Sequence, residues 1–233
     1  LSMSQAQQQK RPNLDEVTTI NKDGSRYMLH PADVKGRFTF GRRLVGWGLV
    51  ALFFILPWIK IPVGNVWRPA VFFDVSSLRY HLFGLTISVQ DLWVFFFIIT
   101  GTGFALFFIT ALLGRVWCGW TCPYTLFNEH VFRRIERLIE GDASARRKLD
   151  AAPMDGAKLF KRILKWTVYA FIAAAISHTF FAYFQSTDRL SNFMSTSPRE
   201  HWGLFLMVWG LAAILLFCFG WFREQFCVVM CPY

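Results

Sequence analysis

Residues 92–113 read LWVFFFIITGTGFALFFITALL, and this stretch decides the fold class. It carries no charged residue and is long enough to cross a bilayer as an α-helix, which takes about 20 residues. A cysteine motif, GRVWCGWTCPY, follows at once at residues 114–124. The sequence therefore predicts a membrane-spanning helix that ends beside a pair of thiols.

Three more apolar runs of similar length lie elsewhere in the chain, at residues 44–59, 166–184 and 202–221. None of them contains Asp, Glu, Lys or Arg, and tryptophans lie near their ends, as in the aromatic belts of membrane proteins. The first run is short, and we expect it to extend back through residues 38–40. Together the four runs predict an all-α, polytopic membrane protein with four transmembrane helices.

The basic residues predict the orientation. Of the 25 Lys and Arg residues, eight lie in residues 1–43, eleven in 114–165 and one at Arg223, against three in 60–91 and two in 185–201. By the positive-inside rule, the N-terminus, the central loop and both cysteine motifs face the cytoplasm. The net charge of +10 lies mainly beside apolar runs. It therefore favours membrane lipid headgroups as partners and disfavours nucleic acid.

The chain also repeats itself. Residues 114–124 and 223–233 both place an aromatic residue before Cys-x-x-x-Cys-Pro-Tyr, and each follows two apolar runs. We expect two hairpins related as parallel repeats about an axis along the membrane normal. The predicted division is a cytoplasmic N-terminal segment (1–41), a first hairpin with its motif (42–124), a cytoplasmic amphipathic loop (125–162) and a second hairpin with its motif (163–233).

The four motif cysteines, Cys118, Cys122, Cys227 and Cys231, are the candidate metal and redox residues. Cysteines four apart on a helix share one face, and paired thiolates select Cu(I), Zn or the iron of iron–sulfur clusters. Proline after the second cysteine would place each pair at a helix terminus. The four thiolates could form one site or two separate two-thiolate sites. Buried, inert thiols are the alternative.

Histidines are weaker candidates for the same chemistry. His178 is the one histidine inside a predicted span, and His130 lies eight residues beyond Cys122. His81 and His201 fall on the predicted outer side, where a haem or copper-entry role is conceivable. A hydrogen-bonded structural histidine is the default for each. Cys218 lies inside the fourth span without a partner motif, and we interpret it as a packing residue.

Two further elements are predicted outside the spans. Residues 17–29 have the alternation and the Asn-Lys-Asp-Gly-Ser turn typical of a short β-hairpin. Residues 126–140 place apolar residues at helical spacing with arginines between them, which predicts an amphipathic helix on the inner leaflet.

Several motifs together resemble one family. Residues 114–124, the stretch IERLIEGD at 135–142 and RKLD at 147–150 are similar to the CcoG/FixG/RdxA family, accessory proteins of cbb3-type cytochrome c oxidase assembly. RPAVFFD at 68–74 and FGLT at 83–86 fit as well. The paired Cys-x-x-x-Cys-Pro is shared with quinol-dehydrogenase relatives, whereas the Ile-Glu-Gly-Asp stretch points to this family.

The resemblance implies a polyferredoxin-like protein of the bacterial inner membrane that reduces Cu(II) to Cu(I) for the oxidase. It also implies [4Fe–4S] clusters whose ligands lie beyond residue 233, so no cluster ligand is named here. Oxidase assembly factors or copper transporters and chaperones are the implied partners. The alternatives are a quinol-dehydrogenase-like electron-transfer subunit and a non-catalytic assembly scaffold.

Overall fold

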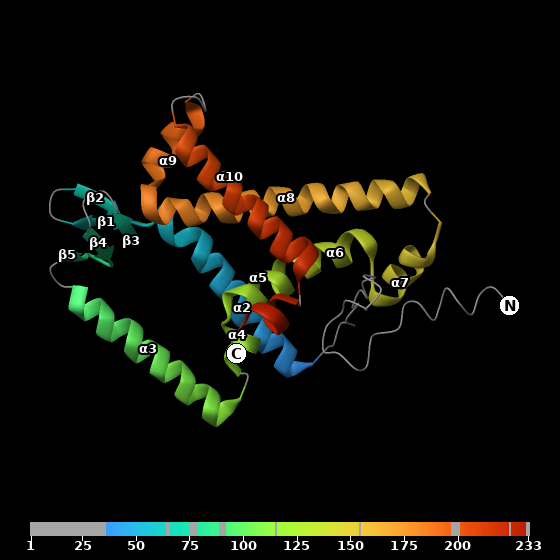
Figure 1. Cartoon of the computed structure of the whole chain (residues 1–233), viewed down its shortest axis with the longest axis horizontal. Helices are drawn as coiled ribbons and strands as arrows, with labels where there is room; N and C mark the ends of the chain where they lie inside the picture. Colours follow the sequence, from blue (N-terminus) through green and yellow to red (C-terminus); the bar gives the residue numbers. More distant parts are fainter. Residues whose placement is uncertain are drawn as a thin grey trace.

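The computed structural model describes residues 36–63, 66–74, 79–88, 92–114, 116–153, 155–196, 201–223 and 225–231 (Figure 1). The α-helices are α2 (Arg37–Ile55), α3 (Leu92–Leu113), α4 (Val116–Trp120), α5 (Pro123–Phe127), α6 (Arg133–Glu140), α7 (Ala143–Ala151), α8 (Gly156–Gln185), α9 (Thr187–Ser195) and α10 (Trp202–Leu216). A 3₁₀ turn, η1 (Leu56–Trp58), extends α2, and the π-helical segments are η3 (Asn128–Phe132), η4 (Phe217–Phe222) and η5 (Phe226–Met230). The predicted hairpin at residues 17–29 lies outside the described residues.

The four predicted spans are confirmed as helices long and apolar enough to cross a membrane: Arg37–Trp58, Phe96–Leu113, Gly156–Gln185 and Trp202–Phe222. The first extends back through residues 38–40, as expected. The third begins well before residue 166, in a stretch that holds four basic residues. Charged residues do not by themselves end a helix. Here Lys158 is buried because its ammonium donates to the carbonyls of Asp150 (3.2 Å) and Ala152 (2.5 Å).

The chain is not all-α, because the loop between the first two spans forms two small sheets. β1 (Lys60–Val63) pairs antiparallel with β2 (Val66–Pro69), and β3 (Val71–Asp74), β4 (Arg79–Leu82) and β5 (Leu85–Ser88) form an antiparallel meander. A two-residue turn with φ of 48° at Phe83 and 90° at Gly84 joins β4 to β5. The strands are only four residues long, and no strand was predicted in this loop from the sequence.

The predicted outer loops lie together at one end of the molecule, where the sheets adjoin the ends of α2 and α8 (Figure 1). Phe73 of β3 packs on Phe184 of α8 with ring centroids 5.7 Å apart, and Tyr183 donates to the Phe53 carbonyl at 2.8 Å. The first cysteine motif adjoins the opposite end of α2, where Trp120 meets Phe38 edge to face at 5.4 Å. The two predicted outer loops thus lie at the same end of the molecule, as expected for loops on one side of a membrane.

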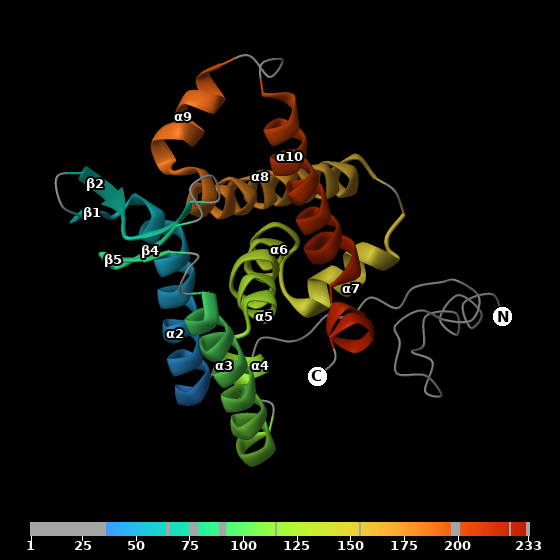
Figure 2. The same ribbon diagram turned by 60° about the vertical axis from the view of Figure 1, so that its left-hand side comes forward.

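The two halves pack differently. α8 and α10 cross in contact, and the Ser177 hydroxyl donates to the Val208 carbonyl at 2.7 Å (Figure 2). In contrast, no residue in the most apolar window of α3 is buried, and α3 stands apart from α8 and α10 in both views. The packing therefore does not show two equivalent hairpins.

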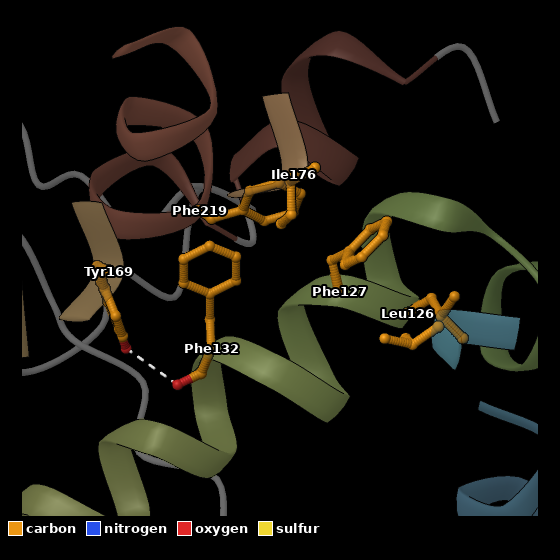
Figure 3. Close-up of a cluster of buried hydrophobic side chains, with 7 residues drawn as sticks. Leu126, Phe127, Phe132, Tyr169, Ile176 and Phe219 are labelled. Carbon is orange, nitrogen blue, oxygen red and sulfur yellow. Dashed lines mark hydrogen bonds between the residues drawn. The ribbon is translucent and has the colours of Figure 1, made fainter. Parts of the chain in front are cut away.

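The buried core lies between the spans and the central loop (Figure 3). It combines residues from α2, α5, η3, α8 and η4: Val50, Leu126, Phe127, Phe132, Tyr169, Ile176 and Phe219. Phe132 stacks on Phe219 at 4.8 Å, and the Tyr169 hydroxyl donates to the Phe132 carbonyl at 3.1 Å. The loop after the first motif is thus packed into the protein.

This packing changes the interpretation of the predicted amphipathic helix. Residues 123–140 are helical throughout, as α5, η3 and α6. However, the buried residues of α6 are Glu136 and Glu140, whereas Leu138 is 84% exposed. A helix that lies on the leaflet by an apolar face is therefore not confirmed, since α6 turns carboxylates toward the protein interior.

Candidate thiol site

The cysteines of the first motif do not share one continuous helix, contrary to expectation. Cys118 lies in α4, and Cys122 is the N-cap of α5 with Pro123 in its first turn. Cys227 lies in η5, and Cys231 is the residue that ends it. The predicted placement at helix termini is confirmed for Cys122 and Cys231. Proline cannot donate a backbone hydrogen bond, and it is favoured at the first position of a helix.

The two motifs share a backbone hydrogen bond, although Cys118 lies in an α-helix and Cys227 in a π-helix. The amide of Cys122 donates to the Trp117 carbonyl at 3.0 Å, and the amide of Cys231 donates to the Phe226 carbonyl at 3.1 Å. Each bond spans five residues and closes a π-type turn around the motif. Both second cysteines then adopt extended ψ angles of 121°. The repeat detected in the sequence is therefore a repeat of local structure.

Tyr124, directly after the first motif, brings the motifs side by side. Its ring stacks on Phe226 with centroids 4.4 Å apart and planes inclined by 16°. Its hydroxyl donates to the carbonyls of Arg223 (2.5 Å) and Cys218 (3.0 Å). A tyrosine of the first repeat thereby supports the turn that leads into the second.

The four thiols nevertheless do not form one cluster. Within the described residues, which include all four motif cysteines, no three His, Cys, Asp or Glu side chains gather to hold a metal ion. Cys227 is exposed and the other three are partly buried. The sequence left open one four-thiolate site or two separate two-thiolate sites. The four-thiolate site is not assembled among the described residues. Cys218 lies in η4, outside both motifs, although its carbonyl accepts from Tyr124.

A buried ionic network, which no pattern in the sequence predicted, joins Arg223 of the second motif to the central loop and α8. Arg223 donates to both carboxylate oxygens of Glu136, each at 3.2 Å. Arg146 pairs with Glu136 at 3.2 Å, and Lys165 pairs with Glu140 at 2.6 Å. All five side chains are at most 7% exposed. Buried charges are stable only when paired in this way.

The electrostatics of Glu136 follow from these contacts. Burial by itself raises the pKa of a carboxyl group, but the guanidinium of Arg223, with Lys165 and Arg146 beside it, holds the pKa of Glu136 below its ordinary value. Glu136 is therefore ionised at neutral pH and joins the central loop, α8 and the second motif. It belongs to the IERLIEGD stretch that carried the family resemblance.

Arg223 occupies an unusual backbone conformation. Its φ is +45° and its ψ is −120°, a combination that residues with a side chain rarely adopt and that costs roughly 1–3 kcal/mol. Gly114 occupies the same place in the first repeat, four residues before the first cysteine, with a φ of +65°. Aligning the repeats could have identified Arg223, because glycine is the ordinary residue for this conformation.

The histidines are held as structural residues. Nδ1 of buried His130 bonds the Leu126 carbonyl at 3.2 Å, and its ring lies against Gly46 of α2. Burial lowers its pKa, and Arg42 and Arg134 act in the same direction. His178 bonds the Ala174 carbonyl at 2.7 Å and meets Trp209 edge to face. Among the described residues, neither histidine joins the motif cysteines in a group of three or more metal-binding side chains.

His81 and His201 also lie away from the thiols. His81 is buried in β4, where Arg68 and Thr86 contact its two ring nitrogens and Phe72 stacks on its face. Burial lowers its pKa, and Arg68 lowers it further. His201 precedes α10 and its ring lies near Phe193.

The π-helical segments concentrate around the motifs. Among the described residues, η3 follows the first motif, η4 precedes the second, and η5 contains Cys227. Such segments are rare, and they occur frequently at functional sites. This distribution marks the two motifs as the part of the chain most distorted from regular helix.

Comparison with known proteins points to the region that holds the first motif. A family model described as a 4Fe–4S binding domain matches residues 92–141, which hold Cys118 and Cys122. A [4Fe–4S] cluster takes four cysteine thiolates. The matched segment holds two, and the described residues bring no three metal-binding side chains together. The match supports iron–sulfur chemistry in proteins of this kind, but these residues do not form a complete cluster site.

Three curated relatives align with most of the chain. Protein RdxA of Cereibacter sphaeroides is 30% identical over 88% of this chain, and nitrogen fixation protein FixG of Rhizobium meliloti is 31% identical over 89%. Protein RdxB of C. sphaeroides is 30% identical over 94%. The chain spans 44%, 40% and 46% of their respective lengths. No solved structure matches. The resemblance that the motifs indicate is confirmed: along most of its length the chain is a homologue of RdxA, FixG and RdxB.

Proposed function

We propose that this chain is part of a membrane redox protein whose paired motif thiols reduce Cu(II) to Cu(I) and retain the product, in support of cbb3-type oxidase assembly. The observation that carries the proposal is the repeated Cys-x-x-x-Cys-Pro turn, with its matching backbone bonds to Trp117 and Phe226. Tyr124 stacks on Phe226 and so holds the two turns, each with two cysteines, beside one another.

The chemistry balances without another group. Two thiols give up two protons and two electrons and form one disulfide, while two Cu(II) ions become two Cu(I) ions. Sulfur is a soft ligand and favours Cu(I) over harder ions, so the remaining reduced pair can retain the product. Copper is the substrate in this scheme. An external donor would be needed to reduce the disulfide for another cycle.

The membrane location supports this assignment, since four helices are long and apolar enough to cross a membrane and the Tyr124–Phe226 stack places the two motifs side by side. We propose that this is the cytoplasmic side of a bacterial inner membrane. The partners would be oxidase assembly factors or copper transporters and chaperones. A second candidate, an electron-transfer subunit of the quinol-dehydrogenase kind, is favoured by the match to a 4Fe–4S binding domain.

The test is a Cu(I)-specific chelator assay on anaerobically purified, fully reduced protein. The four motif thiols can deliver about four electrons, so we expect up to four Cu(I) ions per chain in one burst without an added donor. Removing Cys227 and Cys231 by alanine substitution should halve the burst if the pairs are independent, or abolish it if they act as a unit. Cys218→Ala is the matched control and should leave the burst unchanged.

Equal Cu(I) production and equal copper retention by the wild type and the Cys227→Ala/Cys231→Ala variant would remove copper from the mechanism. An electron-transfer subunit of the quinol-dehydrogenase kind would then be the favoured function. A scaffold role would be favoured if loss of all four motif cysteines left oxidase assembly intact in cells.

A further inference from the structure

We infer that Arg223 is a positioning residue for the second cysteine motif, and that its ion pair with Glu136 fixes the motif against the first. The inference rests on the proposed role of the motif thiols, but its test does not require copper. It starts from the comparison of the two repeats at the residue four places before the first cysteine.

The first repeat uses glycine at this place and the second uses arginine, although both adopt positive φ. A positive φ is strained for arginine and not for glycine. The surrounding structure must therefore hold Arg223 in place. The contacts of its side chain identify what holds it.

The guanidinium is fully engaged in the interior. It bonds both oxygens of Glu136 at 3.2 Å, the Tyr169 hydroxyl at 3.2 Å and, through Nε, the Gly220 carbonyl at 3.1 Å. Bidentate pairing with a carboxylate fixes the plane as well as the position of a guanidinium. The anchor, Glu136, is itself held by Arg146 and Lys165.

The backbone of Arg223 transmits this anchor to both motifs. Its carbonyl accepts from the Tyr124 hydroxyl (2.5 Å) beside the first motif, and from the amide of Phe226 (3.1 Å), which directly precedes Cys227. The same residue thus contacts the loop network by its side chain, the first motif through Tyr124, and the second motif through its own turn. Freeing the side chain should loosen the second motif while leaving the first in place.

Charge balance separates this role from a general structural one. Glu136→Gln would leave three buried cations, Arg223, Arg146 and Lys165, with Glu140 as the one anion of the network, so it should destabilise the whole fold. Arg223→Gly leaves two cations with two anions and also relieves the backbone strain. We therefore expect Arg223→Gly to keep the fold and to lose the position of the motif.

The experiment measures the alkylation rate of each motif cysteine in the full chain in detergent or nanodiscs, by mass spectrometry over a range of pH. In Arg223→Gly we expect Cys231, partly buried in the native turn, to react about tenfold faster, because local opening exposes it. The rate at Cys118 should stay unchanged. Arg223→Lys retains the charge but not the bidentate geometry, and should give an intermediate rate.

Arg133→Gln serves as the matched control, since Arg133 pairs with Glu129 at 2.5 Å in a more exposed position of the same loop. It should change neither rate. Unchanged labelling of Cys231 in Arg223→Gly would overturn the inference, as would equal acceleration at Cys118 and Cys231, which would indicate general loosening. If Arg223→Gly does not fold, the comparison of Arg223→Lys with the control decides in the same way. Failure of the copper assay would leave these outcomes unaffected.

Discussion

His130 and Gly46 show how one residue pair fixes the first span to the loop that follows the first motif. The imidazole is buried, its Nδ1 is tied to the Leu126 carbonyl, and its other edge lies against the glycine of α2. Close approach of a ring to a helix backbone requires a residue without a side chain. The sequence offered His130 as a weak metal candidate, whereas the contact makes it a packing residue.

We predict that Gly46→Ala destabilises the protein by about 1–3 kcal/mol, the range of core overpacking. A Cβ at position 46 would overlap the His130 ring, with Cδ2 at 2.7 Å. Gly48→Ala is the matched control, because nothing lies within 4 Å of a Cβ there and alanine favours helix over glycine. The free energy of unfolding in mixed detergent micelles checks both. Equal effects of the two substitutions would contradict the packing argument, and His130→Ala should relieve the Gly46→Ala loss.

At the scale of elements, hydrophobic runs predict the spans well, and they predict polar packing poorly. α3 has the bounds expected from its uncharged run, 92–113. The missed features are those in which partners distant in sequence decide the structure. Glu136 is buried because Arg223 lies opposite to it, and the strands of the outer loop depend on pairing between short segments. Periodicity within one segment cannot reveal either.

The contact between α8 and α10 leads to a second prediction. Ala173 is 1% exposed on α8 and lies one turn before Ser177, whose hydroxyl donates to the carbonyl of fully buried Val208 on α10. Small residues let membrane helices approach closely. Ala173→Leu should therefore separate the helices and lower the free energy of unfolding by about 1–3 kcal/mol. Ala170→Leu, at an exposed position on the same helix, should be neutral. A comparable loss from both variants would show that the helices do not depend on this small-residue contact.

At the scale of the whole molecule, the repeat predicted from sequence appears in the motif turns more clearly than in the packing of the spans. Both motifs close the same five-residue backbone bond, and Tyr124 places them together. The spans that lead into them differ, since α10 packs against α8 while the central part of α3 has no buried residue. The local spacing of residues around Cys118 and Cys227 was enough to predict the repeated turn. The packing of the helices could not be predicted in this way, because it depends on residues that differ between the two repeats.

The last prediction concerns the sidedness of the membrane. The structure places the sheets near α9 and the ends of α2 and α8, while α7 lies toward the other end of α8 (Figure 1). Single cysteines at Leu85 in β5 and Met194 in α9, both exposed, should therefore react from the same side of the membrane. A cysteine at Ala145 in α7 should react from the opposite side. The excess of basic residues in 1–43 and 114–165 predicts that Ala145 lies on the cytoplasmic side. With the five native cysteines replaced, an impermeant maleimide should label Leu85→Cys and Met194→Cys in intact cells, and Ala145→Cys only in inside-out vesicles.

Labelling of all three from one side would contradict the arrangement of the spans. A complete reversal would keep that arrangement and place both cysteine motifs outside the cytoplasm, where the proposed copper chemistry would need a different electron donor.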